Sequence, residues 1–230
     1  LGYMVWDIAR TIGISNNVDL FLTDSRGKHF VVDSVNVMER SYYKIFINLH
    51  ESLSPLVLYR LWGKYKMRIN YFFRLVYYWL LTGYLHDVLK EGKYDIVHIH
   101  GCNFATEIMI RVCERIGQKY IITLHGLNSF SNTVKQDYSG KRYEKDFLRR
   151  VVEDGVPITV ISSGIKRRIE KEFGPIICNN IYVICNSFAF EKEKEIKQSS
   201  IIRKKYGIPK EGKILLYIGN ISENKNQIQM

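Results

Sequence analysis

Five short apolar runs share one pattern along the chain. Each is rich in β-branched residues, is apolar almost continuously and stops at a small or polar residue. The five runs are Asp95–Gly101, Tyr120–Gly126, Pro157–Ser163, Ile181–Ser187 and Lys213–Gly219. Such runs are typical of strands that are covered on both faces, as in parallel sheets. The pattern therefore predicts five buried, parallel strands.

Helical periodicity lies between several of these runs. Apolar residues recur every four positions across 104–112 and again across 165–173, as on the buried face of a helix. The alternation of strand and helix predicts an α/β fold with a doubly wound parallel sheet. Ligands of such sheets bind in the crevice beyond the carboxyl ends of the strands. The residues that end the runs are therefore the candidates for a site.

The N-terminal part of the chain is less regular. Its pattern predicts the end of a helix at 2–12 and a strand at 18–23. A doubly wound domain ordinarily has a first strand and a glycine-rich turn before such a helix. The sequence shows neither, so we expect the first strand of the sheet to be missing.

A change of character after Ser187 predicts a domain boundary. Charges alternate in sign from Glu191 to Lys197, which is typical of a solvated hinge. We therefore expect an acceptor-side domain at 1–190, a linker at 191–212, and the first strand and turn of a truncated second domain at 213–230.

Residues 55–91 carry a long helical pattern of unusual composition. No acidic residue occurs between Ser52 and His86, and basic residues alternate there with aromatic ones. A basic, aromatic, amphipathic helix suits an anionic membrane surface, with its rings at head-group depth. A core helix with a solvated basic face has the same composition, so both interpretations of 55–80 stay open. Single-stranded nucleic acid is a third, but no nucleic-acid motif accompanies it, and we expect no such partner.

Composition and charge narrow the class of protein. The chain has 230 residues, 46% of them hydrophobic, and a formal charge of +11, which attracts polyanions such as diphosphates or anionic lipids. Four cysteines without C-x-x-C spacing indicate reduced thiols rather than a disulfide framework or a zinc site. We see no signal peptide, and the longest apolar run, Leu75–Leu81, is too short to span a membrane. A cytoplasmic location follows as the expectation, peripheral at the inner face of the membrane if the basic helix docks.

The ends of two predicted strands hold histidines, which are the strongest candidates for binding or catalysis. His98, His100 and Gly101 end one run, and His125 and Gly126 end the next. Residues two apart on a strand point the same way, so the first two imidazoles share a face. A metal would need further ligands, and none has diagnostic spacing, so we expect no metal. The imidazoles can instead hydrogen-bond a ligand near neutral pH, although for His98 a structural bond to the backbone is the preferred interpretation.

The remaining strand ends have simpler explanations. Ser162, which precedes Ser163 and Gly164, is expected to form a turn and helix N-cap. Gly219 ends the last run and, as a glycine, allows a phosphate to approach the backbone closely. Lys225, six residues later, is a cation that can neutralise the phosphate. Glycine-containing turns that bind nothing have the same pattern.

Taken together, these runs resemble glycosyltransferase family 4 in order and spacing. The similarity rests on DIVHIHG at 95–101, YIITLHG at 120–126, ITVISS at 158–163, YVICNS at 182–187 and KILLYIGNISENKN at 213–226. It is close from residue 95 onward and loose before. The resemblance implies two Rossmann-like domains of the GT-B fold, of which this chain holds the N-terminal one. It also implies retaining transfer of a sugar from a nucleotide diphosphate donor to a saccharide or lipid-linked acceptor, without a metal or cofactor.

The same resemblance implies roles for single residues. His125 matches the histidine that assists at the reaction centre, and Gly126 follows it beside the donor. Gly219 and Lys225 resemble the turn and the lysine that hold the donor diphosphate, where positive charge stabilises the leaving group. The acceptor side of the cleft is implied for His100, Gly101 and Asn186.

Departures from the family pattern limit these expectations. Asn220 stands where the family commonly has an arginine that pairs with Lys225, so bidentate phosphate binding is lost. Ser187 replaces a glycine after Asn186. Two glutamates seven residues apart, which the family uses near the donor sugar, are missing, so we expect this segment alone to be inactive or nearly so.

Two other classes of function compete. A nicotinamide-dependent enzyme is disfavoured, because no G-x-G-x-x-G follows a strand and no acidic ribose partner is placed after one. A non-catalytic protein is the second alternative, either a basic domain that docks on membrane lipid or a truncated gene product.

Overall fold

The computed structural model describes residues 2–23, 29–38, 42–66, 69–127, 129–130, 138–175, 178–186, 199–209, 211 and 213. The chain forms two compact units, Leu1–Asn186 and Ser187–Met230. Within the described part of the second unit, the regular element is helix α8, Ser199–Lys205. All strands of the described residues belong to the first unit.

A four-stranded parallel sheet forms the centre of the first unit. Its order is β4 (Val97–His100), β5 (Tyr120–Leu124), β6 (Ile158–Val160) and β7 (Ile181–Val183), and every neighbouring pair is parallel. Four of the five predicted strands are therefore confirmed, along with the α/β class. The fifth run continues into residues 214–219, which lie outside the described part of the chain.

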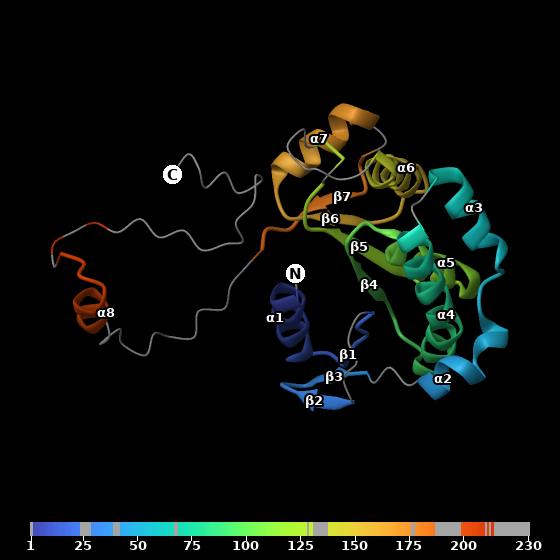
Figure 1. Ribbon diagram of the computed structural model, residues 1–230, viewed down its shortest axis with the longest axis horizontal. Coiled ribbons are helices and arrows are strands. Elements are labelled where there is room, and N and C mark those ends of the chain that lie inside the picture. Colours follow the sequence, from blue (N-terminus) through green and yellow to red (C-terminus); the bar gives the residue numbers. More distant parts are fainter. Residues whose placement is uncertain are drawn as a thin grey trace. The chain divides into compact units, whose positions relative to one another are not determined.

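Helices cover one face of this sheet (Figure 1). The helices α5 (Phe104–Ile116) and α7 (Ser163–Phe173) confirm the predicted periodicities, and α6 (Tyr138–Glu153) lies beside them. Asn103 caps α5 by accepting two backbone N–H groups, and Gly117 ends it with a left-handed φ of 70°.

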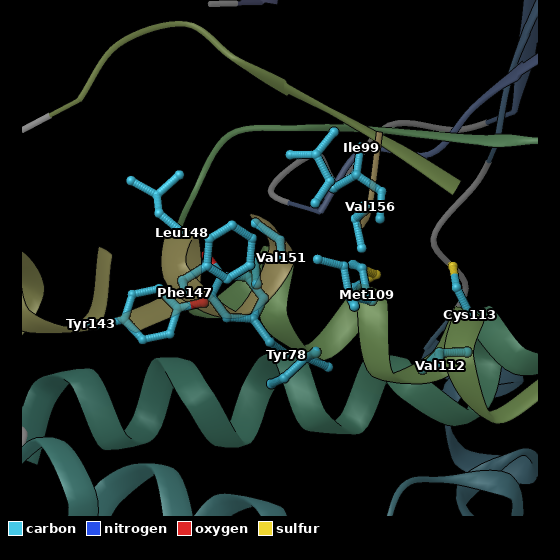
Figure 2. Packing of buried hydrophobic residues seen from close by; sticks show 14 of the residues in the cluster. Tyr78, Ile99, Met109, Val112, Cys113, Tyr143, Phe147, Leu148, Val151 and Val156 are labelled. Atoms are coloured by element: carbon cyan, nitrogen blue, oxygen red, sulfur yellow. The ribbon is translucent and has the colours of Figure 1, made fainter. Parts of the chain in front are cut away.

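Side chains from the strands and helices pack into one apolar core (Figure 2). Ile99, Ile122 and Ile158 enter it from three neighbouring strands, and Phe147 and Val151 enter it from α6. Burial of such side chains contributes about 1.5–3 kcal/mol each. The helix-facing side of the sheet is therefore aliphatic and supports the stability of the fold.

A second, smaller sheet precedes the central one. Its order is β1 (Val18–Leu20), β3 (Val35–Val37) and β2 (Phe30–Val32), with β1 and β3 parallel and β2 and β3 antiparallel. Helix α1 (Gly2–Gly13) packs on it, so the predicted N-terminal helix and the strand predicted at 18–23 are confirmed. The Tyr94 hydroxyl donates to the Asp19 carboxylate and joins this sheet to the segment before β4.

The predicted long helical region at 55–91 is two helices rather than one. The helices are α3 (Leu56–Tyr65) and α4 (Ile69–Gly92), and Lys66 after α3 adopts a left-handed backbone with φ 46° and ψ 49°. Before them lie α2 (Tyr42–Ile47) and the 3-10 turn Leu49–Glu51.

The two ends of α4 differ in burial. Residues 81–86 of α4 are all buried, whereas residues 69–71 are exposed. The core interpretation therefore holds for the C-terminal half of α4, and the surface interpretation stays open for α3 and the start of α4. No helix in the described ranges combines the length and the apolar content of a membrane span.

Candidate active site

The structure brings His98, His100 and His125 together at the carboxyl ends of β4 and β5. Strand pairing places His100 opposite Thr123, and His125 follows two residues later on the same face. His100 Nδ1 lies 3.0 Å from His125 Nε2, with the two rings stacked at 17° and their centroids 5.2 Å apart. The rings of His98 and His100 are 4.2 Å apart. Parallel strands that end at one rim have thus assembled a row of three imidazoles.

Two threonines that the sequence analysis missed anchor this row. His98 Nε2 lies 2.6 Å from Thr123 Oγ1, and Thr123 Oγ1 lies 2.5 Å from Thr159 Oγ1 on β6. The expected backbone bond of His98 is therefore wrong, because its partner is a hydroxyl side chain. Period-2 alternation alone does not show which residues of neighbouring strands share a face. The register of β4, β5 and β6 places His98, Thr123 and Thr159 on one face.

All three imidazoles are shifted toward the neutral form. Burial, which penalises a charged ring, lowers the pKa of His98 and His125, and it lowers the pKa of His100 to about 3 from an ordinary 6.5. At neutral pH each ring therefore carries one N–H donor and one bare nitrogen acceptor. The Nδ1 atom of His125 is buried and has no hydrogen-bond partner among the residues that the structure describes.

The glycines beside these histidines shape the rim. Gly101 has a φ of +106°, a conformation that favours glycine, and its N–H donates to the Thr123 carbonyl at 2.9 Å. Gly126 is exposed, and a Cβ added there would meet nothing within 4 Å. The backbone after both histidines is thus open to close approach.

Other predicted site residues are placed elsewhere. Asn186 is exposed beyond β7, at the opposite edge of the central sheet from β4, so it is not brought together with His100. Ser162 caps α7 by accepting from the Ile165 N–H, which confirms its structural role. Gly219 and Lys225 lie outside the described residues.

A separate cavity of about 280 Å³ lies between α3, α5 and α6, and none of the predicted site residues lines it. Its wall includes the buried Glu107 carboxylate, whose two oxygens accept from Arg111 Nε and Arg150 Nη2, each at 2.8 Å. On the same wall Asp146 pairs with Lys64 at 3.0 Å. These pairs hold the three helices together.

Metal ligation has no geometric basis in the described ranges, because they contain no group of three or more histidine, cysteine or carboxylate side chains placed to hold an ion. Of the residues that the structure describes, no carboxylate or thiol hydrogen-bonds the imidazole row.

Comparison with known proteins decides the family. The family model described as Glycosyltransferase Family 4 matches residues 35–191. The chain belongs to glycosyltransferase family 4. The match covers β3 to β7 and includes the imidazole row and Asn186, whereas Gly219 and Lys225 lie beyond it. No curated protein matches the chain. The central sheet with its helices is accordingly the Rossmann-like fold of this family's N-terminal domain, and the activity class is glycosyl transfer from a sugar donor to an acceptor.

Proposed function

We propose that this chain transfers a sugar from a nucleotide diphosphate sugar to a saccharide or lipid-linked acceptor with retention, in cell-surface polysaccharide synthesis. The reaction class follows from the family. The observation that carries the proposal is the hydrogen-bonded pair of His100 and His125, held neutral at the carboxyl ends of two adjacent parallel strands. Polar groups at this rim are where open α/β sheets bind ligands.

In this proposal His125 acts at the reaction centre. A neutral imidazole hydrogen-bonds the hydroxyl groups of a donor sugar without attracting the diphosphate away from its own site. The Gly126 backbone, Gly219 and Lys225 bind the donor, and the lysine charge stabilises the diphosphate as the glycosidic bond breaks. Positive charge on the protein replaces a metal ion, and no cofactor takes part.

The acceptor side of the proposed cleft starts from β4. His100 and Gly101 lie next to His125 at the rim, so a hydroxyl held there is close to the donor sugar. Asn186 stands farther along the same rim, where it contacts a larger acceptor. Its place at the other edge of the sheet from His100 suits a saccharide of more than one unit.

Turnover of labelled nucleotide sugars by the intact reading frame tests the role of His125. We expect His125→Ala to lower kcat/KM by about 100-fold or more, the usual loss when a positioned imidazole is removed. The matched control is His29→Ala, because His29 is an exposed histidine outside the imidazole row. Equal turnover by wild type and His125→Ala removes His125 from the mechanism.

A second proposal places the enzyme at the inner face of a membrane through an aromatic–basic surface on α3 and the start of α4. Tyr59 is 69% exposed and Phe73 is 65% exposed, although both are aromatic. The Trp62 ring contacts the Phe72 ring at 5.2 Å, which joins the two helices into one surface. Large exposed rings beside cations are typical of an interface with anionic lipid.

Binding to vesicles of phosphatidylglycerol tests this surface. Replacing the exposed Arg60, Lys66 and Arg74 by glutamine removes three cations, at about 1 kcal/mol each, and should weaken binding roughly 100-fold. The control removes three exposed charges from α7 instead, through glutamine at Arg167, Arg168 and Lys171. Equal loss in both variants would show charge attraction without a defined surface, and no binding by wild type would overturn the proposal.

A further inference from the structure

His125 has two ring nitrogens with different surroundings. Nε2 lies within hydrogen-bond distance of His100 Nδ1, whereas Nδ1 is buried and has no partner in the described part of the chain. Buried polar atoms are nearly always hydrogen-bonded, so an unpartnered one calls for an explanation. The position of the single proton on this ring decides what the orphan atom offers to a ligand.

The neutral state of both rings leaves two arrangements of their protons. In the first, His100 donates from Nδ1 and His125 carries its proton on Nδ1, where a buried N–H has no acceptor. In the second, His125 donates from Nε2 to His100, and its Nδ1 is a bare acceptor. Buried N–H groups without partners are rarer in proteins than under-satisfied acceptors. The second arrangement is therefore favoured.

Three strands hold His100 in place for this contact. Thr159 on β6 is bonded to Thr123 on β5, and Thr123 is bonded to the His98 ring. That ring lies 4.2 Å from the ring of His100 and tilts by 32° against it. The hydrogen-bonded chain thus restricts the ring on which His100 rests, and His100 in turn restricts His125.

We propose that His100 is a positioning residue that accepts the Nε2–H of His125 and thereby fixes His125 as the Nε2–H tautomer. Among the described residues, the Nδ1 lone pair of His125 then has no partner, and because the atom is buried, a ligand reaches it only when the groups that cover it move aside. Its partner is then a hydroxyl that donates. His125 accordingly selects a sugar hydroxyl as a donor to its ring and does not itself donate to the sugar. This inference rests on the proposed function for the identity of the ligand, but not for the tautomer.

Nitrogen-15 imidazole spectra of the chain without ligand test the tautomer directly. Wild type should show the proton of His125 on Nε2. His100→Phe keeps a ring of similar size but loses the acceptor, so the two tautomers of His125 should mix. His100→Asn places an amide oxygen near the lost nitrogen and should restore the wild-type pattern.

Turnover measurements on the same substitutions, made in the intact reading frame, provide the second readout. We expect kcat to fall about 10-fold in His100→Phe, the effect of one lost hydrogen bond, and to recover in His100→Asn. A wild-type His125 with its proton on Nδ1, or an unchanged tautomer in His100→Phe, would overturn the inference. The expected spectra together with a fully active His125→Ala would instead overturn the proposed function and leave the positioning contact standing.

Discussion

Gly83 lies within α4 where the backbone of residues 48–52 passes over the helix. A Cβ added at Gly83 would lie 2.8 Å from the Asn48 carbonyl carbon and 2.9 Å from Ser52 Oγ, with the carbonyl oxygen of Asn48 closer still. Backbone atoms cannot turn away as a flexible side chain can. Gly83→Ala therefore forces residues 48–52 off the helix.

That segment is tied to α4 by hydrogen bonds that the shift would break. The Leu53 N–H donates to Thr82 Oγ1 at 3.1 Å, and Trp79 Nε1 donates to the Leu53 carbonyl at 2.7 Å. Overpacking costs about 1–3 kcal/mol, and each lost hydrogen bond adds about 1 kcal/mol. Alanine regains about 1 kcal/mol of helix propensity. The net expectation is a loss of about 3 kcal/mol in the free energy of unfolding.

Urea unfolding followed by circular dichroism measures this loss, with Gly63→Ala as the matched control. Gly63 is a helical glycine of α3, and a Cβ added there meets nothing within 4 Å. Its substitution should raise stability by about 1 kcal/mol through helix propensity alone. Opposite signs for the two variants support the close approach at Gly83. A Gly83→Ala variant as stable as wild type refutes it.

Three further predictions follow from burial and charge. Glu107→Ala should cost about 3 kcal/mol of stability, because it leaves Arg111 and Arg150 without their shared buried carboxylate. The control Glu114→Ala, at an exposed site, should cost under about 1 kcal/mol. Equal urea midpoints for the two variants would contradict this prediction. Burial lowers the pKa of His100 from 6.5 to about 3, so the unfolded chain binds the proton first as the pH falls. The free energy of unfolding should therefore decrease as the pH drops from 6.5 toward 3. Between pH 6.5 and 5.5, His100→Asn should lose less stability than wild type. In the native chain iodoacetamide should modify Cys185 first, because it is exposed while burial raises the pKa of Cys113 to about 12; mass spectrometry showing Cys113 modified first would be incompatible with the structure.

The central sheet could be predicted from the sequence because its strands are buried on the helix side and read as continuous apolar runs. The hairpin of β2 and β3 could not, since all three residues of β2 are exposed and the turn at Asp33 and Ser34 uses left-handed backbone that neither residue type demands. Helix α6 was missed although Tyr143, Phe147 and Val151 recur every four residues and are buried. The helical periodicity of α6 is therefore visible in the sequence, although the sequence analysis did not use it.

The candidate site was only partly predictable. The prediction that His100 and His125 lie close together is confirmed, because the carboxyl ends of neighbouring parallel strands lie at one rim of the sheet. It did not predict the partner of His98, since a hydrogen bond to a threonine hydroxyl depends on register between strands, which one strand alone does not reveal. The donor turn at Gly219 and Lys225 stays a prediction.

Successive side chains of β4 point to opposite faces of the sheet, so core residues and candidate site residues are direct neighbours in the sequence. Ile99 is buried in the apolar core, whereas its neighbours His98 and His100 belong to the imidazole row on the opposite face. A continuous apolar strand would have served the fold equally well on both faces, as is usual for parallel sheets. Polar residues on one face therefore weaken burial there, and the Thr159–Thr123–His98 hydrogen bonds offset that cost. A face that is polar, hydrogen-bonded across three strands and ended by a ring nitrogen without a partner among the described residues fits the proposed ligand site at the rim.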